Sequence, residues 1–269
     1  TYFTELYRQD LQDALNYLKE TDPEFYRVEK DYSSATYTMD SLAQGYRGIS
    51  TYNSVLNGNL KEFVDVCYPE LYYMDQNRYA FWPNAEDNFL AAFTGVRYLL
   101  SKSGDLDSSK YELMHLYRNV QEAATARFYV NTISEDSLKE LCNEENRETL
   151  LENSLALEDG REIEDLSDLE EISDAQKKSS VVLNAPEKDS CITGTVSARA
   201  DGYVLCMIPY ENGWTVSVDG EEVETEKGDL GFLAFPVKEG EHQLTITFHA
   251  PGLKAGAGAS IVCWIIYFG

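Results

Sequence analysis

Basic residues are scarce in this sequence. Its 269 residues include 22 Lys and Arg against 47 Asp and Glu, which gives a formal net charge of −25. Nucleic-acid-binding proteins neutralise phosphates with clusters of Lys and Arg, and proteins that dock on anionic lipid headgroups use basic patches. The charge therefore excludes nucleic acid as an expected partner. It favours a solubilising surface, with a field that attracts cations or a basic partner as the alternative.

Motifs for catalysis and metal binding are also lacking. The three histidines are His115, His242 and His249, and none has metal-ligand spacing with a Cys or a second His. The sequence contains no H-E-x-x-H, no glycine-rich phosphate loop and no G-x-S-x-G. Carboxylates are too numerous for a glycosidase-like pair to be singled out. We assign no catalytic residue, no metal site and no cofactor from the sequence.

The cysteines do not form the framework of a disulfide-rich protein. The five are Cys67, Cys142, Cys191, Cys206 and Cys263, an odd number at wide spacing. We expect Arg199–Gly202 to turn a hairpin that places Cys206 opposite Thr195, about 13 Å along the strand from Cys191. That separation is too large for a disulfide. The cysteines therefore leave the compartment open. The charged, amphipathic N-terminus is not a signal peptide, and the chain resembles an excised part of a longer protein.

The first 150 residues mix helix and strand patterns. Apolar spacing and capping residues predict helices over 4–20, 57–69, 84–95 and 134–141 and strands over 24–30 and 96–100. Proline should end the first helix at Asp22-Pro23, because a helix stops before proline. We expect residues 1–150 to form one mixed α/β domain.

The middle of the chain is acidic. From Glu152 to Asp174 there are ten acids and one base, Arg161. We interpret residues 151–180 as an acidic linker or an excursion with a solvated face. A calcium site is the sharper alternative, but the acids lack the D-x-[DN]-x-[DN]-G order of a calcium loop.

From Val181 onward the pattern is that of β-structure. Besides the Arg199–Gly202 turn, Asp219-Gly220 predicts a tight hairpin, and residues 230–250 predict another. Short strands about ten residues apart are typical of a sandwich or jelly roll. The predicted fold class is α+β: a mixed α/β N-terminal part followed by an antiparallel β-sandwich, jelly-roll-like, over residues 181–254.

The end of the chain has no charge over fifteen residues, 255–269. As a helix this run spans about 22 Å, whereas a bilayer core is about 30 Å thick. It is too short to cross alone but fits the start of a transmembrane helix. The alternative is a final strand or helix inside the sandwich core.

Residues from Ile208 to Gly256 resemble the C-terminal ectodomain of the YfhO family of bacterial multi-pass membrane proteins. The matching elements, in order, are Pro209-Tyr210, Gly213-Trp214, Asp219-Gly220, Gly231-Phe232, Gly240 with His242, Phe248 and Pro251-Gly252. Upstream, Phe25–Lys30, Gly45–Ser54 and Phe93–Ser101 are also similar to family elements. The acidic stretch has no counterpart in this resemblance.

The resemblance implies a function that the residues do not show. Family members resemble lipid-linked sugar transferases that decorate cell-wall polymers such as lipoteichoic acid from undecaprenyl-phosphate sugars. Their catalytic acid is expected on an early extracytoplasmic loop outside this chain. The chain would be an extracytoplasmic domain at the cell membrane, inactive alone, that positions glycan or acceptor polymer. A non-catalytic cell-surface carbohydrate-binding module and a free-standing hydrolase stay open as alternatives.

Aromatic residues supply the candidate substrate-binding positions. Sugars dock their apolar faces on aromatic rings, while nearby Arg, amide or carboxylate groups bind the hydroxyls. The candidates are Tyr46, Arg47 and Tyr52 in "GYRGISTY" and Trp82 and Asp87, with Asn84, in "YAFWPNAED". The alternative is that the aromatics are half-buried packing residues and Arg47 pairs with one of the many acids.

Overall fold

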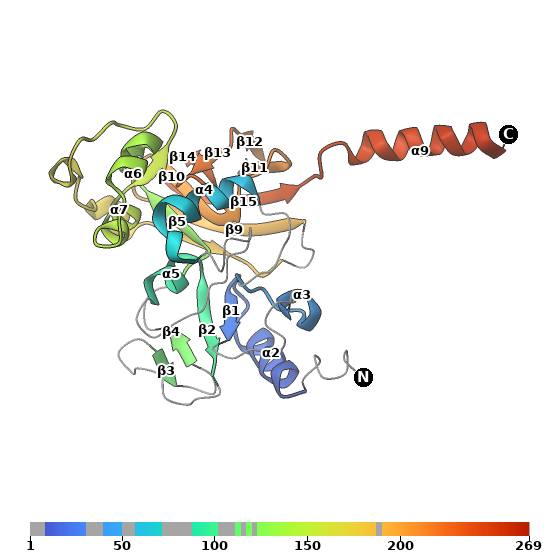
Figure 1. Ribbon diagram of the computed structural model, residues 1–269, viewed down its shortest axis with the longest axis horizontal. Coiled ribbons are helices and arrows are strands. Elements are labelled where there is room, and N and C mark those ends of the chain that lie inside the picture. The colour runs from blue at the N-terminus through green and yellow to red at the C-terminus, as the bar shows by residue number, and fades with distance from the viewer. Residues whose placement is uncertain are drawn as a thin grey trace.

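The computed structural model describes residues 9–30, 40–49, 57–71, 88–101, 111–113, 117–119, 123–186 and 190–268. The helices are α2 (Gln9–Thr21), α3 (Asp40–Gln44), α4 (Gly58–Cys67), α5 (Asn88–Phe93), α6 (Glu135–Leu141), α7 (Arg147–Asn153), α8 (Asp174–Lys178) and α9 (Leu253–Phe268), with 3-10 turns η1 (Pro69–Leu71) and η2 (Leu166–Asp168). The strands are β1 (Arg27–Lys30), β2 (Val96–Leu100), β3 (Tyr111–Leu113), β4 (Tyr117–Asn119), β5 (Ala126–Tyr129), β6 (Thr132–Ser134), β7 (Leu155–Leu157), β8 (Ser180–Leu183), β9 (Cys191–Ala198), β10 (Gly202–Pro209), β11 (Trp214–Val218), β12 (Glu221–Val223), β13 (Glu226–Gly228), β14 (Phe232–Val237) and β15 (Gly240–Phe248). The fold is α+β, as predicted (Figure 1).

The N-terminal part is built on a four-stranded sheet with the order β1-β2-β4-β3, in which β1 and β2 are parallel. Helix α2 packs on it because its leucines recur at helical spacing. Leu11, Leu15 and Leu18 are buried and share a core cluster with Val28 and Leu100 of the sheet. The helix ends at Thr21, immediately before Asp22-Pro23, as the sequence predicts.

The C-terminal part is the predicted sandwich of two antiparallel sheets. One sheet has the order β13-β14-β10-β5 and the other β12-β11-β15-β9-β8. Their facing side chains form one core, to which the two sheets contribute Val204, Cys206, Leu233 and Phe235 and Val196, Val216, Leu244 and Ile246. Strand β5 comes from the first 150 residues and pairs with β10, so this sheet contains strands from both halves of the chain.

The predicted Asp219-Gly220 hairpin is confirmed. Both residues have positive φ, 53° and 88°, and β11 pairs with β12 across them. A two-residue hairpin turn of this kind needs positive φ at both central positions.

The other two predicted hairpins are wrong. Strand β10 pairs with β14 and β5 rather than with β9, and β15 pairs with β9 and β11 rather than with β14. The chain changes sheet at residues 199–201 and again at 238–239. The physical reason is burial: β10 is apolar on both faces, with Leu205 and Met207 in one core and Val204 and Cys206 in another. A strand of that type needs cover on both sides.

The acidic stretch carries short elements of secondary structure. Strand β7 pairs in parallel with β6, and Leu155, Leu157 and Ile163 are buried in the same core as α4, α5 and one face of β10. The acids lie between and on either side of these anchors, at positions that face solvent.

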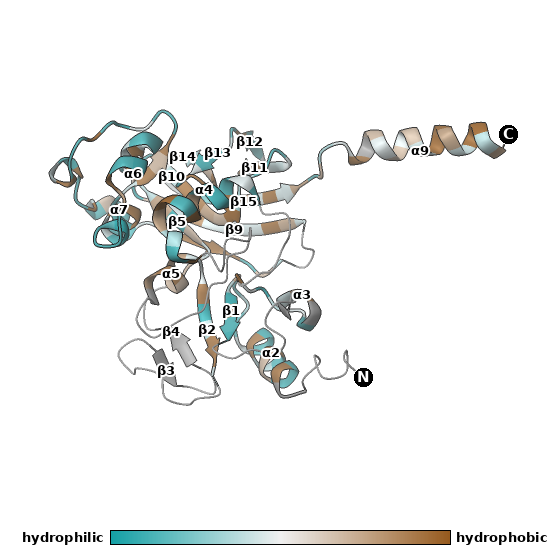
Figure 2. Cartoon of the chain, viewed as in Figure 1, coloured by the Kyte–Doolittle hydropathy of each residue, from teal (hydrophilic) through white to brown (hydrophobic). Residues whose placement is uncertain are grey.

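Helix α9 stands apart from the folded body. It projects from the end of the sandwich in Figure 1, and Figure 2 shows its apolar colouring along the half nearest the C-terminus. Its side chains are exposed, Ile261 by 61% and Ile266 by 76%. The alternative of a buried strand or core helix is therefore wrong. Among the described residues, no helix has both the length and the apolar character that crossing a membrane requires.

Candidate functional site

A cavity of about 670 Å³ lies beside the N-terminal sheet. We call it the Tyr46 pocket. Its walls are Leu15, Lys19, Asp22, Pro23, Glu24, Tyr26, Val28, Ser41, Leu42, Gly45, Tyr46, Arg47, Ala185 and Pro186. Its volume falls in the range of sites for small ligands. Two of the predicted binding residues, Tyr46 and Arg47, therefore lie together in one cavity.

Residues 45–49 are fixed along the free edge of β1. The backbone N–H of Val28 donates to the carbonyl oxygen of Arg47 at 2.9 Å. The N–H of Ile49 donates to the carboxylate of Glu29, which is only 2% exposed. Gly48 permits this approach, because a Cβ there would lie 2.9 Å from Glu29 Oε1. The pocket wall is thus held by backbone contacts as well as by side-chain packing.

Two tyrosine rings contribute apolar surface to the pocket. Tyr46 packs against the α2–β1 core, and Tyr26 meets Tyr98 edge-on, with ring centroids 5.1 Å apart. Burial raises the pKa of Tyr26 to about 12, and the charge of Asp22 adds to the shift. The Tyr26 phenol therefore keeps its proton, and its capacity to donate, throughout the physiological range.

Charged groups of both signs surround these rings. Arg97 binds Asp22 Oδ2 at 2.7 Å and Glu24 Oε2 at 2.8 Å, and the Tyr98 hydroxyl donates to Asp22 Oδ2 at 2.9 Å. Arg47 is exposed, and its guanidinium carbon lies 5.3 Å from the centroid of the Phe25 ring. Ring faces with donors and acceptors at their edges suit a polyhydroxylated ligand. Because Asp22 and Glu24 are both bound to Arg97, the pocket suits ligand binding more than proton transfer.

The remaining predicted site residues are not placed. Tyr52, Trp82, Asn84 and Asp87 lie outside the described residues. The structure adds Asp22, Glu24 and Tyr26 to the pocket, where the sequence pattern predicts only the end of a helix and the start of a strand. The available signal was the alternation in "EFYRVEK", which puts Tyr26 on the same side of β1 as Val28 and Lys30.

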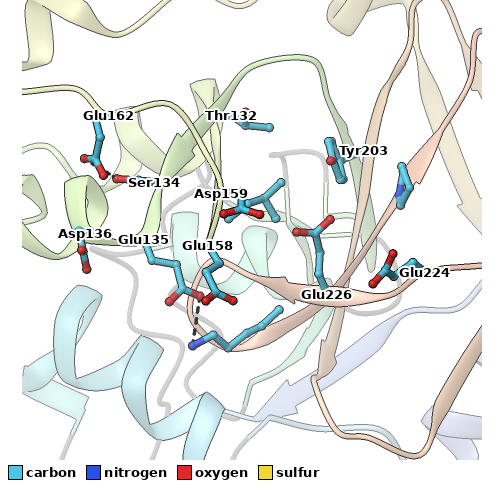
Figure 3. A pocket seen from close by; sticks show the side chains of 13 residues that line it. Thr132, Ser134, Glu135, Asp136, Glu158, Asp159, Glu162, Tyr203, Glu224 and Glu226 are labelled. Atoms are coloured by element: carbon cyan, nitrogen blue, oxygen red, sulfur yellow. Dashed lines mark hydrogen bonds and ion pairs between the residues drawn. The ribbon is translucent and has the colours of Figure 1, made fainter.

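A second cavity, of about 770 Å³, is acidic. We call it the acidic basin. It is lined by Thr132, Ser134, Glu135, Asp136, Leu157, Glu158, Asp159, Glu162, Tyr203, Glu224, Glu226, Lys227 and Pro236 (Figure 3). Lys227 binds Glu135 at 3.1 Å and Glu62 at 3.0 Å. The acidity of residues 152–174 predicts a solvated face. The sequence does not reveal that Glu135 and residues 224–226 line the same cavity as acids of that stretch.

Carboxylates in and beneath this basin have raised pKa values. The pKa of Glu226 is raised by burial and by the charges of Glu224 and Asp159. Burial raises the pKa of Asp229 to about 7, and Glu135 adds to that shift. Within the described ranges, no three His, Cys, Asp or Glu side chains converge as they would around a metal ion.

Fold and site together define an α+β domain with a mixed aromatic and charged pocket and an exposed apolar helix at one end. The chain belongs to the YfhO family, described as "Bacterial membrane protein YfhO". The family model matches residues 2–171 and 163–260 of this chain. The expectation drawn from the sequence motifs is thereby confirmed. The chain is also similar to the "Uncharacterized protein YfhO" of Bacillus subtilis (strain 168), with 28% identity over 96 residues. That alignment covers 33% of this chain and 11% of the relative. No solved structure matches the chain.

Proposed function

We propose that this chain is the extracytoplasmic domain of a multi-pass membrane protein that transfers lipid-linked sugars to a cell-wall polymer. In this proposal the domain performs no chemistry alone. It binds glycan or the acceptor polymer in the Tyr46 pocket and holds it near an active site in the membrane part of the protein. Membership of a membrane-protein family supports the membrane part of this proposal.

The observation that carries the proposal is the composition of the Tyr46 pocket. Tyr26 and Tyr46 offer ring surface, while Arg47 and Glu24 supply a donor and an acceptor at the rim. The side chain of Glu24 remains 44% exposed despite its bond to Arg97. Sugar recognition requires this combination of an apolar platform and polar groups at its edge.

Helix α9 supports the location at a membrane. It contains no charged residue after Lys254 and is exposed along its length. Exposed apolar patches of this kind mark surfaces that contact lipid or another protein. We propose that α9 is the first part of a membrane-spanning helix and that it tethers the folded body outside the cell.

Binding of the purified domain to neutral oligosaccharides and to deacylated, sugar-substituted lipoteichoic acid, measured by titration calorimetry, tests the proposal. The Tyr46→Ala change removes a ring face and should weaken binding roughly tenfold, about 1.4 kcal/mol. The matched control is Tyr203→Ala, which removes a half-buried tyrosine from the acidic basin and should leave the affinity unchanged. If the two variants bind as the parent does, or if neutral glycans and polymer fail to bind at all, the Tyr46 pocket is not a glycan site.

A non-catalytic carbohydrate-binding module is the second candidate, because the same pocket would serve it. The two proposals differ in the cell. If the domain only binds, Tyr46→Ala in the full-length protein lowers polymer binding and leaves the sugar content of the polymer unchanged. If it serves a transferase, the sugar content falls too.

A further inference from the structure

Strand register fixes the end of the sandwich from which α9 leaves. Strand β15 ends at Phe248, whose N–H donates to the carbonyl oxygen of Ser190 at 3.0 Å, directly before β9 begins. Residues 249–252 connect β15 to α9. The five steps from Phe248 to Leu253 reach at most about 18 Å when fully extended. The base of α9 therefore stays close to the start of β9.

The Tyr46 pocket lies at this same end of the sandwich. Its lining includes the dipeptide Ala185-Pro186, which is bonded to the N-terminal part through the N–H of Ala185 and the carbonyl oxygen of Pro23, 3.1 Å apart. The preceding residue, Asn184, donates its N–H to the carbonyl oxygen of Thr193 in β9 at 2.8 Å. Thr193 pairs with Thr245 of β15, which is three residues, or about 10 Å, from the end of that strand. In Figure 1, α2 and α3, which supply other walls of the pocket, lie on the side of the body from which α9 leaves.

The acidic basin lies at the opposite end. Two of its lining residues, Tyr203 and Pro236, are paired between β10 and β14 next to the points where residues 199–201 and 238–239 pass to the other sheet. Strand β15 begins there, at Gly240, about 27 Å from its last residue. Figure 1 shows α6, which contributes to the basin wall, on the side of the body away from α9. The two cavities are thus separated along the length of the sandwich.

The charges of the two cavities differ in a way that suits this arrangement. Lys19 and Arg47 are exposed in the wall of the Tyr46 pocket, where Asp22 and Glu24 bind Arg97. The basin lining has seven acids and one basic residue. An anionic bilayer surface attracts Lys and Arg and repels carboxylates, over about 8 Å at physiological ionic strength. A bilayer at the α9 end would meet the exposed cations, while the acids of the basin would lie beyond the range of repulsion.

We propose that the Tyr46 pocket faces the bilayer and takes the sugar headgroup of a lipid-anchored glycan. This inference rests on the proposed function, because it takes α9 as the membrane tether and a glycan as the ligand. A membrane-spanning helix is tilted by only about 20° on average from the bilayer normal, so the end of the sandwich at its base is turned towards the lipid. Sugars carried on lipids reach the pocket directly from the bilayer surface, whereas polymer further from the membrane meets the acidic basin.

Energy transfer to labelled lipids tests the placement of the pocket. The full-length protein, reconstituted in nanodiscs whose lipid headgroups carry an acceptor, has p-azidophenylalanine with an attached donor fluorophore in place of either Leu42 or Lys238. Leu42, in the pocket wall, is 72% exposed, and the side chain of Lys238, at the basin end, is 81% exposed. We expect stronger transfer from position 42 than from position 238. Equal transfer, or stronger transfer from position 238, would overturn the proposal.

Photo-cross-linking tests the ligand. The same two positions carry p-benzoylphenylalanine, and the nanodiscs contain a radiolabelled glycolipid with a neutral disaccharide headgroup. We expect labelled protein from position 42 and only background from position 238. The Tyr46→Ala change should lower the label at position 42 roughly tenfold at subsaturating glycolipid, because it removes a ring face from the pocket. Label that is equal at the two positions, or that Tyr46→Ala leaves unchanged, would contradict the proposal.

Failure of this inference can be told apart from failure of the proposed function. If soluble oligosaccharide binds and Tyr46→Ala weakens that binding, while position 42 takes up no glycolipid, the pocket is a glycan site that the bilayer does not supply. That result overturns the present inference alone. If position 42 gives the stronger energy transfer but neither soluble nor lipid-anchored glycan binds, the pocket faces the bilayer without being a glycan site, and both proposals fall.

Discussion

The two cavities of this domain treat carboxylates in opposite ways. In the Tyr46 pocket, Asp22 and Glu24 both bind Arg97, and tyrosine rings complete the wall. In the acidic basin, Lys227 is the single basic residue of the lining, and it faces seven acids. Asp22 and Glu24 are therefore paired with a cation in the first cavity, whereas burial and nearby acids disfavour the charged form of Glu226 in the second.

The pKa shifts follow this difference. Glu226 in the basin and Asp229 beneath it have raised pKa values because burial and like charges disfavour their ionised forms. The comparison teaches that net charge alone does not identify a site. The carboxylates of one acidic region are paired with Arg97, whereas the other region keeps a field that favours protons or cations.

Asp229→Asn should give the largest change in stability. The folded-state pKa is about 7, well above the ordinary value of 3.8 for this group, so the stabilisation by this carboxyl group is complete below pH 4 and is lost as pH rises towards 7. Through that window the parent should lose about 1.4 kcal/mol per pH unit relative to the variant, a few kcal/mol in total. Asparagine keeps an oxygen for the Ala156 N–H and tolerates the positive φ of this position.

Urea denaturation between pH 4 and pH 8 measures the effect. Asp136→Asn is the control, because that side chain is 82% exposed and its substitution should leave the stability curve of the parent unchanged. Parallel stability curves for the parent and Asp229→Asn would show that Asp229 does not titrate in this range.

Asp22→Asn should change stability in the opposite direction and by less. The variant leaves Arg97, whose side chain is 16% exposed, with a weaker partner and removes the charged acceptor of Tyr98. We expect a loss of about 1–3 kcal/mol at neutral pH. The control is Asp174→Asn, which breaks an exposed ion pair with Lys178 and should cost less than about 0.5 kcal/mol. Equal losses in the two variants would show that the pairing of Asp22 with Arg97 stabilises the fold no more than an exposed ion pair does.

Local pattern predicted the elements better than their pairing. The leucine spacing of α2, the Ser134 cap of α6 and the Asp219-Gly220 turn depend on neighbouring residues, and the structure contains all of them. The pairing of β10 with β14 and β5 depends on a second core formed by distant helices, which short-range alternation does not reveal.

The candidate site was predictable to a similar extent. "GYRGISTY" identified Tyr46 and Arg47 from residue type. Asp22 and Glu24 line the same pocket and bind Arg97, which lies 73 to 75 positions further along the chain, and local pattern does not reveal that pairing. The acidic basin depends on the fold of 152–174, where Leu155, Leu157 and Ile163 are the buried anchors among the acids. The composition of that stretch predicts a solvated face. It does not indicate that Glu135 and residues 224–226 form the other walls of a cavity there.

The sugar content of the cell-wall polymer in cells is the most direct test of the central claim, that the Tyr46 pocket positions glycan or acceptor. The full-length protein would carry Tyr46→Ala with Arg47→Ala, or Tyr203→Ala as the control, at equal protein levels. The account predicts a fall of about tenfold or more in sugar substitution for the double variant and the parental amount for the control. A double variant that decorates the polymer as fully as the parent would contradict it.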